Sequence, residues 1–348
     1  MMLLSRVLPA LLAVSGLVQA ASVAVRTDES FFQEFVNELK DNNLTILADN
    51  YKRIADTNEG KSIVNTLKNG GELTILAPED DAFDREYTSL DPNVIKYSTL
   101  WGSIDKNFQT ADSWFTRRGA SKSHSTARST FRRPGSGGGS KRDIDKNELD
   151  KFQVQVVDKF NNDELWKRWT NHPLILIDRA VGSAKVVNRF TFKKIIVLII
   201  DTVLTLPARV SELLCKPLIN DAPNGFTKAA EALNKTGLID LVDTRDALTA
   251  FVPVDESLGD MHEHSDSELT SLLKNHFFFG TIVYTTLFPK ICEATAESGK
   301  ELKFTFENDI NYVSCGKTKA IILRGDVIST NGVIHIIDRP LVWLVVGS

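Results

Sequence analysis

Apolar residues recur at helical spacing near the start of each half of the chain. In the first half Phe31, Phe35 and Leu39 form a stripe, and the segment Phe226–Leu233 repeats this pattern in the second half. Apolar residues three and four positions apart lie on one face of a helix. Gly237 then stands where a left-handed helix C-cap is favoured. The pattern predicts an amphipathic helix early in each half.

The second half ends in short β-rich runs. Residues 303–306, 311–314, 320–323 and 333–337 are rich in Phe, Tyr, Val and Ile and are separated by Gly, Asn and Asp. Such runs predict strands, and Asn331-Gly332 predicts a hairpin turn before the last of them. Each unit of the chain should therefore begin with helices and end in a meander of strands, which gives an α+β fold.

An internal repeat links the two halves. Leu73–Phe83 parallels Leu248–Leu258: in both segments an apolar strand meets a Pro, and acidic residues follow. Two further pairs of segments match in the same order. Residues 91–102 correspond to 268–280, and residues 195–204 correspond to 332–341. Three landmarks in one order predict two homologous units. The adjacent carboxylates after each Pro are interpreted as helix N-terminal capping groups rather than as acid-base or cation sites.

Composition and the first residues of the chain narrow the class of protein. The 348 residues are 42% hydrophobic and 25% charged, which is typical of two globular domains, and the net charge of −4 gives no attraction to nucleic acid. Residues 1–20 combine Arg6, an apolar stretch and small residues before Ala21, which predicts a signal peptide. We expect no transmembrane segment in the mature chain.

A secretory route makes two kinds of covalent modification relevant. Asn43 and Asn234 begin Asn-x-Thr sequons and are predicted glycosylation sites. The chain has three cysteines. They allow one disulfide, for which Cys292 and Cys315 are the candidate pair and Cys215 the remaining thiol, or alternatively three buried, unpaired thiols.

Residues 113–146 are rich in basic residues, Gly and Ser, and we predict that they form a flexible loop inserted in the first unit. Its basic charge could attract anionic glycans or membrane surfaces. The dibasic pair Lys141-Arg142 is a candidate site for proteolytic processing, and the alternative is an uncleaved, solvated loop.

The segments Thr74–Phe83 and Thr330–Asp338 resemble the two signature motifs of FAS1 (fasciclin) domains. The resemblance implies two tandem FAS1 domains at 30–207 and 213–344, each a small β-sandwich wedge packed with helices. The first domain is divergent, because Phe192-Lys-Lys-Ile195 replaces the Thr-Asn-Gly-Val of the motif and Leu198 stands in the place of His335.

The resemblance also implies a function. FAS1 proteins are associated with adhesion, so we expect a non-enzymatic interaction protein of the cell surface, cell wall or matrix that binds a protein or a glycan. In adhesive members an Asp-Ile and a Tyr-His pair are linked to receptor binding. The matching positions make Asp326, Val327 and His276 the candidate receptor-binding residues. The alternative is a solvated turn carboxylate at Asp326, with His276 and His335 packed inside the domain.

Catalytic and metal-binding templates fit poorly. His262-Glu263-His264 lacks the one-turn spacing of helix-borne zinc ligands, Gly316-Lys317-Thr318 lacks the earlier Gly of a phosphate-binding loop, and no Gly-x-Ser-x-Gly occurs. We therefore expect no enzyme activity, no metal and no cofactor. Two alternatives remain open: a luminal vacuolar or endomembrane factor in membrane trafficking, and a secreted hydrolase with an unfamiliar site.

Overall fold

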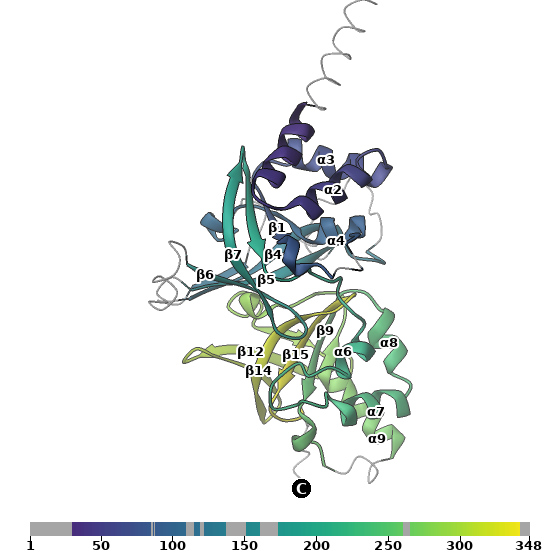
Figure 1. Cartoon of the computed structure of the whole chain (residues 1–348). Helices are drawn as coiled ribbons and strands as arrows, with labels where there is room; N and C mark the ends of the chain where they lie inside the picture. The colour runs from purple at the N-terminus through teal and green to yellow at the C-terminus, as the bar shows by residue number, and fades with distance from the viewer. Residues whose placement is uncertain are drawn as a thin grey trace, which may run out of the picture.

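The computed structural model describes residues 30–84, 86, 88–108, 115–118, 122–136, 151–160, 173–259 and 265–341. The predicted signal peptide, Lys141-Arg142 and the segment 262–264 lie outside these residues. The described chain forms two units, one above the other in Figure 1, and each combines helices with one mixed sheet. The predicted α+β class is confirmed.

The first unit has a helix over residues 30–41 and an eight-stranded sheet in the order β2-β1-β8-β7-β6-β5-β4-β3. Its helices pack on β1 and β8 around Phe35, Leu39 and Tyr51, all of which are buried. The remaining elements are α2 Thr45–Ile54, α3 Asn58–Asn69, α4 Pro92–Tyr97, β1 Leu73–Pro78, β2 Thr99–Trp101, β3 Phe115–Arg118, β4 Lys122–Arg132, β5 Phe152–Phe160, β6 Leu174–Asp178, β7 Ser183–Phe192 and β8 Ile195–Ile200.

The second unit has a seven-stranded sheet in the order β10-β9-β15-β14-β13-β12-β11. One core lies between its helices and the sheet, and a second core lies between the strands around Phe251, Phe288 and Phe304. Its elements are α6 Val210–Leu214, α7 Thr227–Lys235, α8 Ile239–Thr244, α9 Asp266–Leu273, β9 Leu248–Pro253, β10 Phe277–Phe278, β11 Glu293–Thr295, β12 Glu301–Glu307, β13 Ile310–Cys315, β14 Thr318–Ile328 and β15 Gly332–Ile337.

The two units repeat one arrangement of central strands. β1 runs parallel to β8 with Leu73 opposite Ile195, and β9 runs parallel to β15 with Leu248 opposite Gly332. All residues of these four strands are buried, which explains their continuous apolar sequences. The three sequence landmarks therefore occupy matching places in the two units.

The acidic residues after each Pro cap a helix that is distant in sequence. Asp80 accepts hydrogen bonds from the backbone N–H groups of Thr45 and Ile46 at the start of α2. Asp255 does the same for Lys228 at the start of α7. Neither helix has a capping side chain of its own. These carboxylates satisfy exposed donors and complement the helix dipole, so the capping interpretation holds.

The predicted flexible loop over 113–146 is wrong for its described part, which contains β3 and β4. In β4 the small side chains at positions 123, 125, 127 and 129 are buried. The basic side chains alternate with them and lie over aromatic rings, with Arg128 and Arg132 5.0 and 5.1 Å from the ring centroid of Phe152. The segment is therefore a strand with a small-residue face and a basic face, paired along its length with β5.

The predicted Cys292–Cys315 disulfide is not formed in this structure. All three cysteines lie in the described part of the chain and are unpaired. Cys292 precedes β11 and Cys315 ends β13, while β12 lies between these strands. The alternative of unpaired thiols describes the structure, but its expectation that all three are buried is wrong, because only Cys315 is buried. Asn43 and Asn234 are exposed, and their glycosylation stays a prediction.

Gly332 is needed for a close approach rather than for turn conformation. It begins β15 after the connection from β14, and a Cβ built on it would lie 1.9 Å from the carbonyl oxygen of Leu248. The parallel pairing of β9 with β15 therefore requires glycine at this position. The predicted hairpin connection is present, but the role of its glycine differs from the expected one.

We expect Gly332→Ala to lower the free energy of unfolding by at least ~2 kcal/mol, because the added methyl group must push β9 and β15 apart. Gly259→Ala is the matched control, since a Cβ there would meet no atom within 4 Å. Urea unfolding monitored by circular dichroism measures both changes. Equal stability of the two variants would contradict the close-approach explanation.

Candidate functional site

The candidate site is the seam between the two units, where β4, β5 and the β6–β7 turn of the first unit face β14 and the segment 283–287 of the second. Figure 1 shows β5 directly above the second unit. Val154 of β5 belongs to the apolar core of the second unit, and Ala180 of the β6–β7 turn packs against its helical core. The seam is thus part of the folded core.

His124 lies between two carboxylates in the seam. Its Nδ1 is 2.7 Å from Asp158 Oδ1 on β5, and its Nε2 is 2.9 Å from Asp326 Oδ2 in the second unit. Because both ring nitrogens face carboxylates, the ring is a cation that donates to both. Burial alone would lower the pKa of His124, but the two carboxylates outweigh it and raise the pKa to about 9. Lys122 pairs with Asp158 at 2.9 Å.

Asp326 is the buried end of this network, with an exposed fraction of 1%. Its backbone has φ of 60°, a left-handed conformation that Asp tolerates better than most residues. The carboxylate accepts hydrogen bonds from the N–H and the hydroxyl of Thr285 in addition to His124. Burial would raise the pKa of Asp326, but the hydrogen bond and charge of His124, with help from the hydrogen bond of Thr285, hold it well below its usual range.

His335 connects Asp326 to the interior of the second unit. The backbone N–H of Asp326 donates to His335 Nδ1 at 3.2 Å, and His335 Nε2 lies 2.9 Å from the carbonyl oxygen of Val283. His335 is therefore neutral with its proton on Nε2. Burial lowers its pKa despite the nearby Asp326 charge.

Further polar contacts extend the seam. Arg324 Nη2 lies 3.0 and 3.1 Å from the two carboxylate oxygens of Asp178, and the guanidinium also donates to the carbonyl oxygens of residues 179, 180 and 218. Arg133 donates to Asp246 at 2.8 Å, and the Gln153 amide donates to the carbonyl oxygens of residues 329 and 330. A planar guanidinium with a carboxylate and several carbonyls gives a directional attachment, so the seam fixes the orientation of the units.

The three predicted receptor-binding residues are buried. Asp326 faces His124, and Val327 packs in the helical core of the second unit. His276 Nδ1 donates to the carbonyl of Leu272 at 3.0 Å, while Nε2 accepts from the N–H of Leu341 at 2.8 Å. Burial lowers the pKa of His276 to about 4. The packing alternative describes both histidines, but the solvated carboxylate expected at Asp326 is wrong, because Asp326 is buried. The receptor-binding role of the three residues stays a prediction that requires them to become accessible.

His124, Asp158 and Arg324 are the seam residues that sequence reasoning missed. Two of them lie on strands of the first unit whose positions opposite β14 follow from long-range pairing. A signal for His124 does exist, because residues 122–132 alternate small with long polar side chains at the period of a strand.

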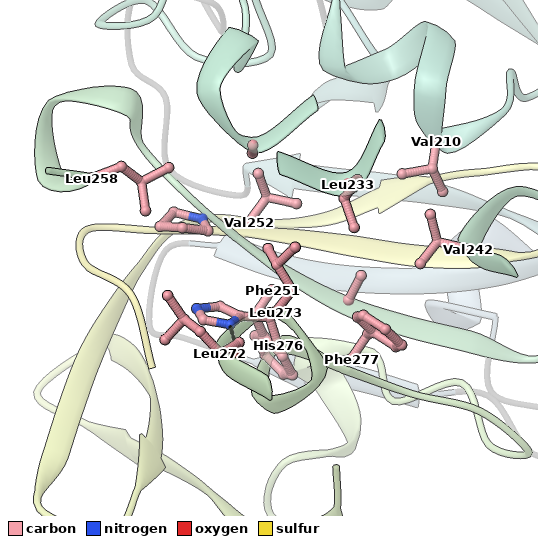
Figure 2. A pocket seen from close by; sticks show the side chains of 13 residues that line it. Val210, Leu233, Val242, Phe251, Val252, Leu258, Leu272, Leu273, His276 and Phe277 are labelled. Atoms are coloured by element: carbon pink, nitrogen blue, oxygen red, sulfur yellow. Dashed lines mark hydrogen bonds between the residues drawn. The ribbon is translucent and has the colours of Figure 1, made fainter. Parts of the chain in front are cut away.

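An apolar pocket lies between the helices and the sheet of the second unit (Figure 2). Leu233, Phe251 and Phe277 are among its lining residues, and its free space is about 40 Å³. Both ring nitrogens of His276, which also lines it, already have backbone partners. The pocket is therefore a packing space with no free polar group on its histidine. In the described ranges no group of three or more His, Cys, Asp or Glu residues could hold a metal ion.

The seam should weaken at alkaline pH. In the unfolded chain the pKa of a His is ~6.5. Because folding raises the pKa of His124, its contribution to stability is fully present below pH ~6.5 and is lost as the pH rises through about 9. We expect the urea midpoint to fall between pH ~6.5 and about 9. His124→Gln should remove this fall and cost about 3 kcal/mol at neutral pH, because Asp326 then stays buried without its charged partner.

Lys106→Gln serves as the control, because it breaks an exposed ion pair with Glu72 in the first unit and should change stability by less than ~1 kcal/mol. An unchanged alkaline fall in His124→Gln would show that another group titrates there.

Comparison with known proteins places the second unit in a family. The fasciclin domain model matches residues 224–343. The fasciclin-like arabinogalactan protein elcF of Phaeosphaeria nodorum is 29% identical over 121 residues, which are 34% of this chain and 38% of that protein. A FAS1 domain pair of the insect cell adhesion molecule fasciclin I is 17% identical over 87% of this chain and 98% of that one, with a TM-score of 0.37.

The matched residues run from the loop before α7 to just past β15, so they include both landmark strands of the second unit and the whole sheet that carries Asp326 and His335. The family model therefore covers the segment Thr330–Asp338, on which the resemblance of this unit to FAS1 domains rests. The family model thus identifies a fasciclin domain in residues 224–343, which lie in the second unit.

Proposed function

We propose that this protein is a non-enzymatic adhesion protein that binds a partner at the cell surface, in the cell wall or in the extracellular matrix. The match of residues 224–343 to the fasciclin domain carries this proposal. The similarity to a fasciclin-like arabinogalactan protein, which spans 38% of that relative's length, supports a cell-wall or surface setting. Secretion through the predicted signal peptide belongs to the same proposal. None of the helices in the described ranges is long and apolar enough to cross a membrane.

The outer face of β13 and β14 is the contact surface that we assign to a partner protein. Tyr312 lies opposite Ile321 across the two strands, and Ile310 and Leu323 follow on the same face at a spacing of two residues. Ile310 is 38% exposed and Leu323 is 49% exposed. Exposed aliphatic side chains beside a tyrosine, with the Lys319–Glu307 pair nearby, resemble the apolar centre and charged rim of a protein-binding surface.

The proposal predicts that purified protein binds saturably to intact cells or to a wall fraction. Ile310→Ser combined with Leu323→Ser should weaken this binding at least about thirtyfold, because each side chain loses about 1 kcal/mol or more of apolar burial. Fluorescently labelled protein and a sedimentation assay measure the affinity.

Val181→Ser is the matched control, because Val181 is 43% exposed but lies on the first unit. Its affinity should equal that of the unmodified chain. Absence of saturable binding to every surface and wall fraction would overturn the proposed function, whereas equal binding by the double variant would overturn only the assigned surface.

A further inference from the structure

A polar cavity lies at the seam, separate from the Asp326–His124 contact although Asp326 forms part of its wall. Residues from the β6–β7 turn, α4, β14 and the connection 204–208 line it, and polar atoms make up most of its surface. Its free space is about 60 Å³. One water needs at least ~10–15 Å³ by this measure, so several waters or one small ion fit.

Three hydrogen-bond donors without partners line this cavity. Arg179 and Lys216 are half-buried, and neither side chain has a hydrogen bond or an ion pair with any other residue. Tyr97 is 6% exposed, and its hydroxyl has no hydrogen bond to a described residue. Burial and the charge of Asp178 raise the pKa of Tyr97 far above its usual value, so the hydroxyl stays protonated and remains a donor.

The charges around the cavity leave an excess of positive charge. Its two carboxylates are already neutralised, because Asp178 pairs with Arg324 and Asp326 pairs with His124. Arg179 and Lys216 have no such counter-charge. Two cations and a buried hydroxyl donor around one cavity match the needs of an oxyanion, which carries negative charge and several acceptor oxygens.

We propose that the seam holds a binding site for a small oxyanion, which Arg179, Lys216 and Tyr97 bind together. The shared chemistry is a group with two or more charged oxygens, and it is supplied either by a free inorganic ion or by the carboxylate of an acidic sugar. Tyr97 and Arg179 belong to the first unit and Lys216 to the second, so the bound anion bridges the two units. The site does not depend on the proposed adhesive function.

The test measures binding of inorganic phosphate and of galacturonate to the full mature chain by calorimetry, at constant ionic strength in chloride. We expect saturable binding of at least one of them. Arg179→Gln combined with Lys216→Gln should lower the affinity at least tenfold, and Tyr97→Phe should lower it up to about tenfold, because one hydrogen bond to a charged group is lost.

Lys61→Gln combined with Arg209→Gln is the matched control, because it removes the same charge from exposed positions outside the cavity. Its affinity should stay unchanged. Binding of phosphate alone identifies a free ion as the ligand, and binding of galacturonate alone identifies a sugar carboxylate. Failure of both anions to bind, or equal weakening by the control and the cavity variant, overturns the site. Melting in chloride confirms that each variant is folded.

Discussion

The buried carboxylate of Asp326 is the constraint on which the arrangement of the two units depends. A carboxylate that is 1% exposed needs a charged partner and several hydrogen bonds, because desolvation of an unpaired charge costs several kcal/mol. The second unit supplies the N–H and the hydroxyl of Thr285, but the cation comes from His124 of the first unit. The second unit therefore contains a polar group that its own residues do not neutralise, and this favours a fixed two-unit body over two independent domains.

The same constraint explains the asymmetry between the units. His335 lies opposite Phe251, and Leu198 occupies the matching position opposite Leu76. In the second unit the ring is needed to hold the backbone of Asp326 and the carbonyl of Val283. Leu198 packs in an apolar cluster, where an apolar side chain is the better choice. Leu198 therefore fits the apolar packing of the first unit, whereas His335 serves the buried carboxylate residue of the second unit.

Much of the fold could be predicted from local patterns. The paired central strands, the Pro that ends them and the acidic residues after it all follow from short segments, and each occurs twice. β4 could not be recognised by its apolar content, because the face that it buries in the first unit is made of Ser and Ala. The opposite face carries His124 and Thr126, which contact the second unit. Only the period of two in the sequence indicates a strand.

The candidate site could be predicted in part. The resemblance to FAS1 domains identifies Asp326 as a candidate receptor-binding residue. Its partner His124 lies 202 residues away in the sequence. Burial of Asp326 depends on that long-range contact, and no local pattern encodes it. The role of Gly332 has the same origin, because its lack of a side chain matters through the carbonyl of Leu248 on a different strand. The sequence shows which residue occupies each of these positions, but it does not show which distant residues contact it in the fold.

The closed seam also decides between two ways of binding a partner. A receptor that contacts Asp326 must first separate it from His124, and breaking a buried charge pair costs about 3–5 kcal/mol. That cost lowers the apparent affinity by roughly two to four powers of ten. A partner on the outer face of β13 and β14 meets Ile310 and Leu323 without any rearrangement. Unless a receptor recovers the cost through new contacts to Asp326, we expect the outer sheet face to bind a partner more strongly, with Asp326 holding that face in a fixed orientation to the first unit.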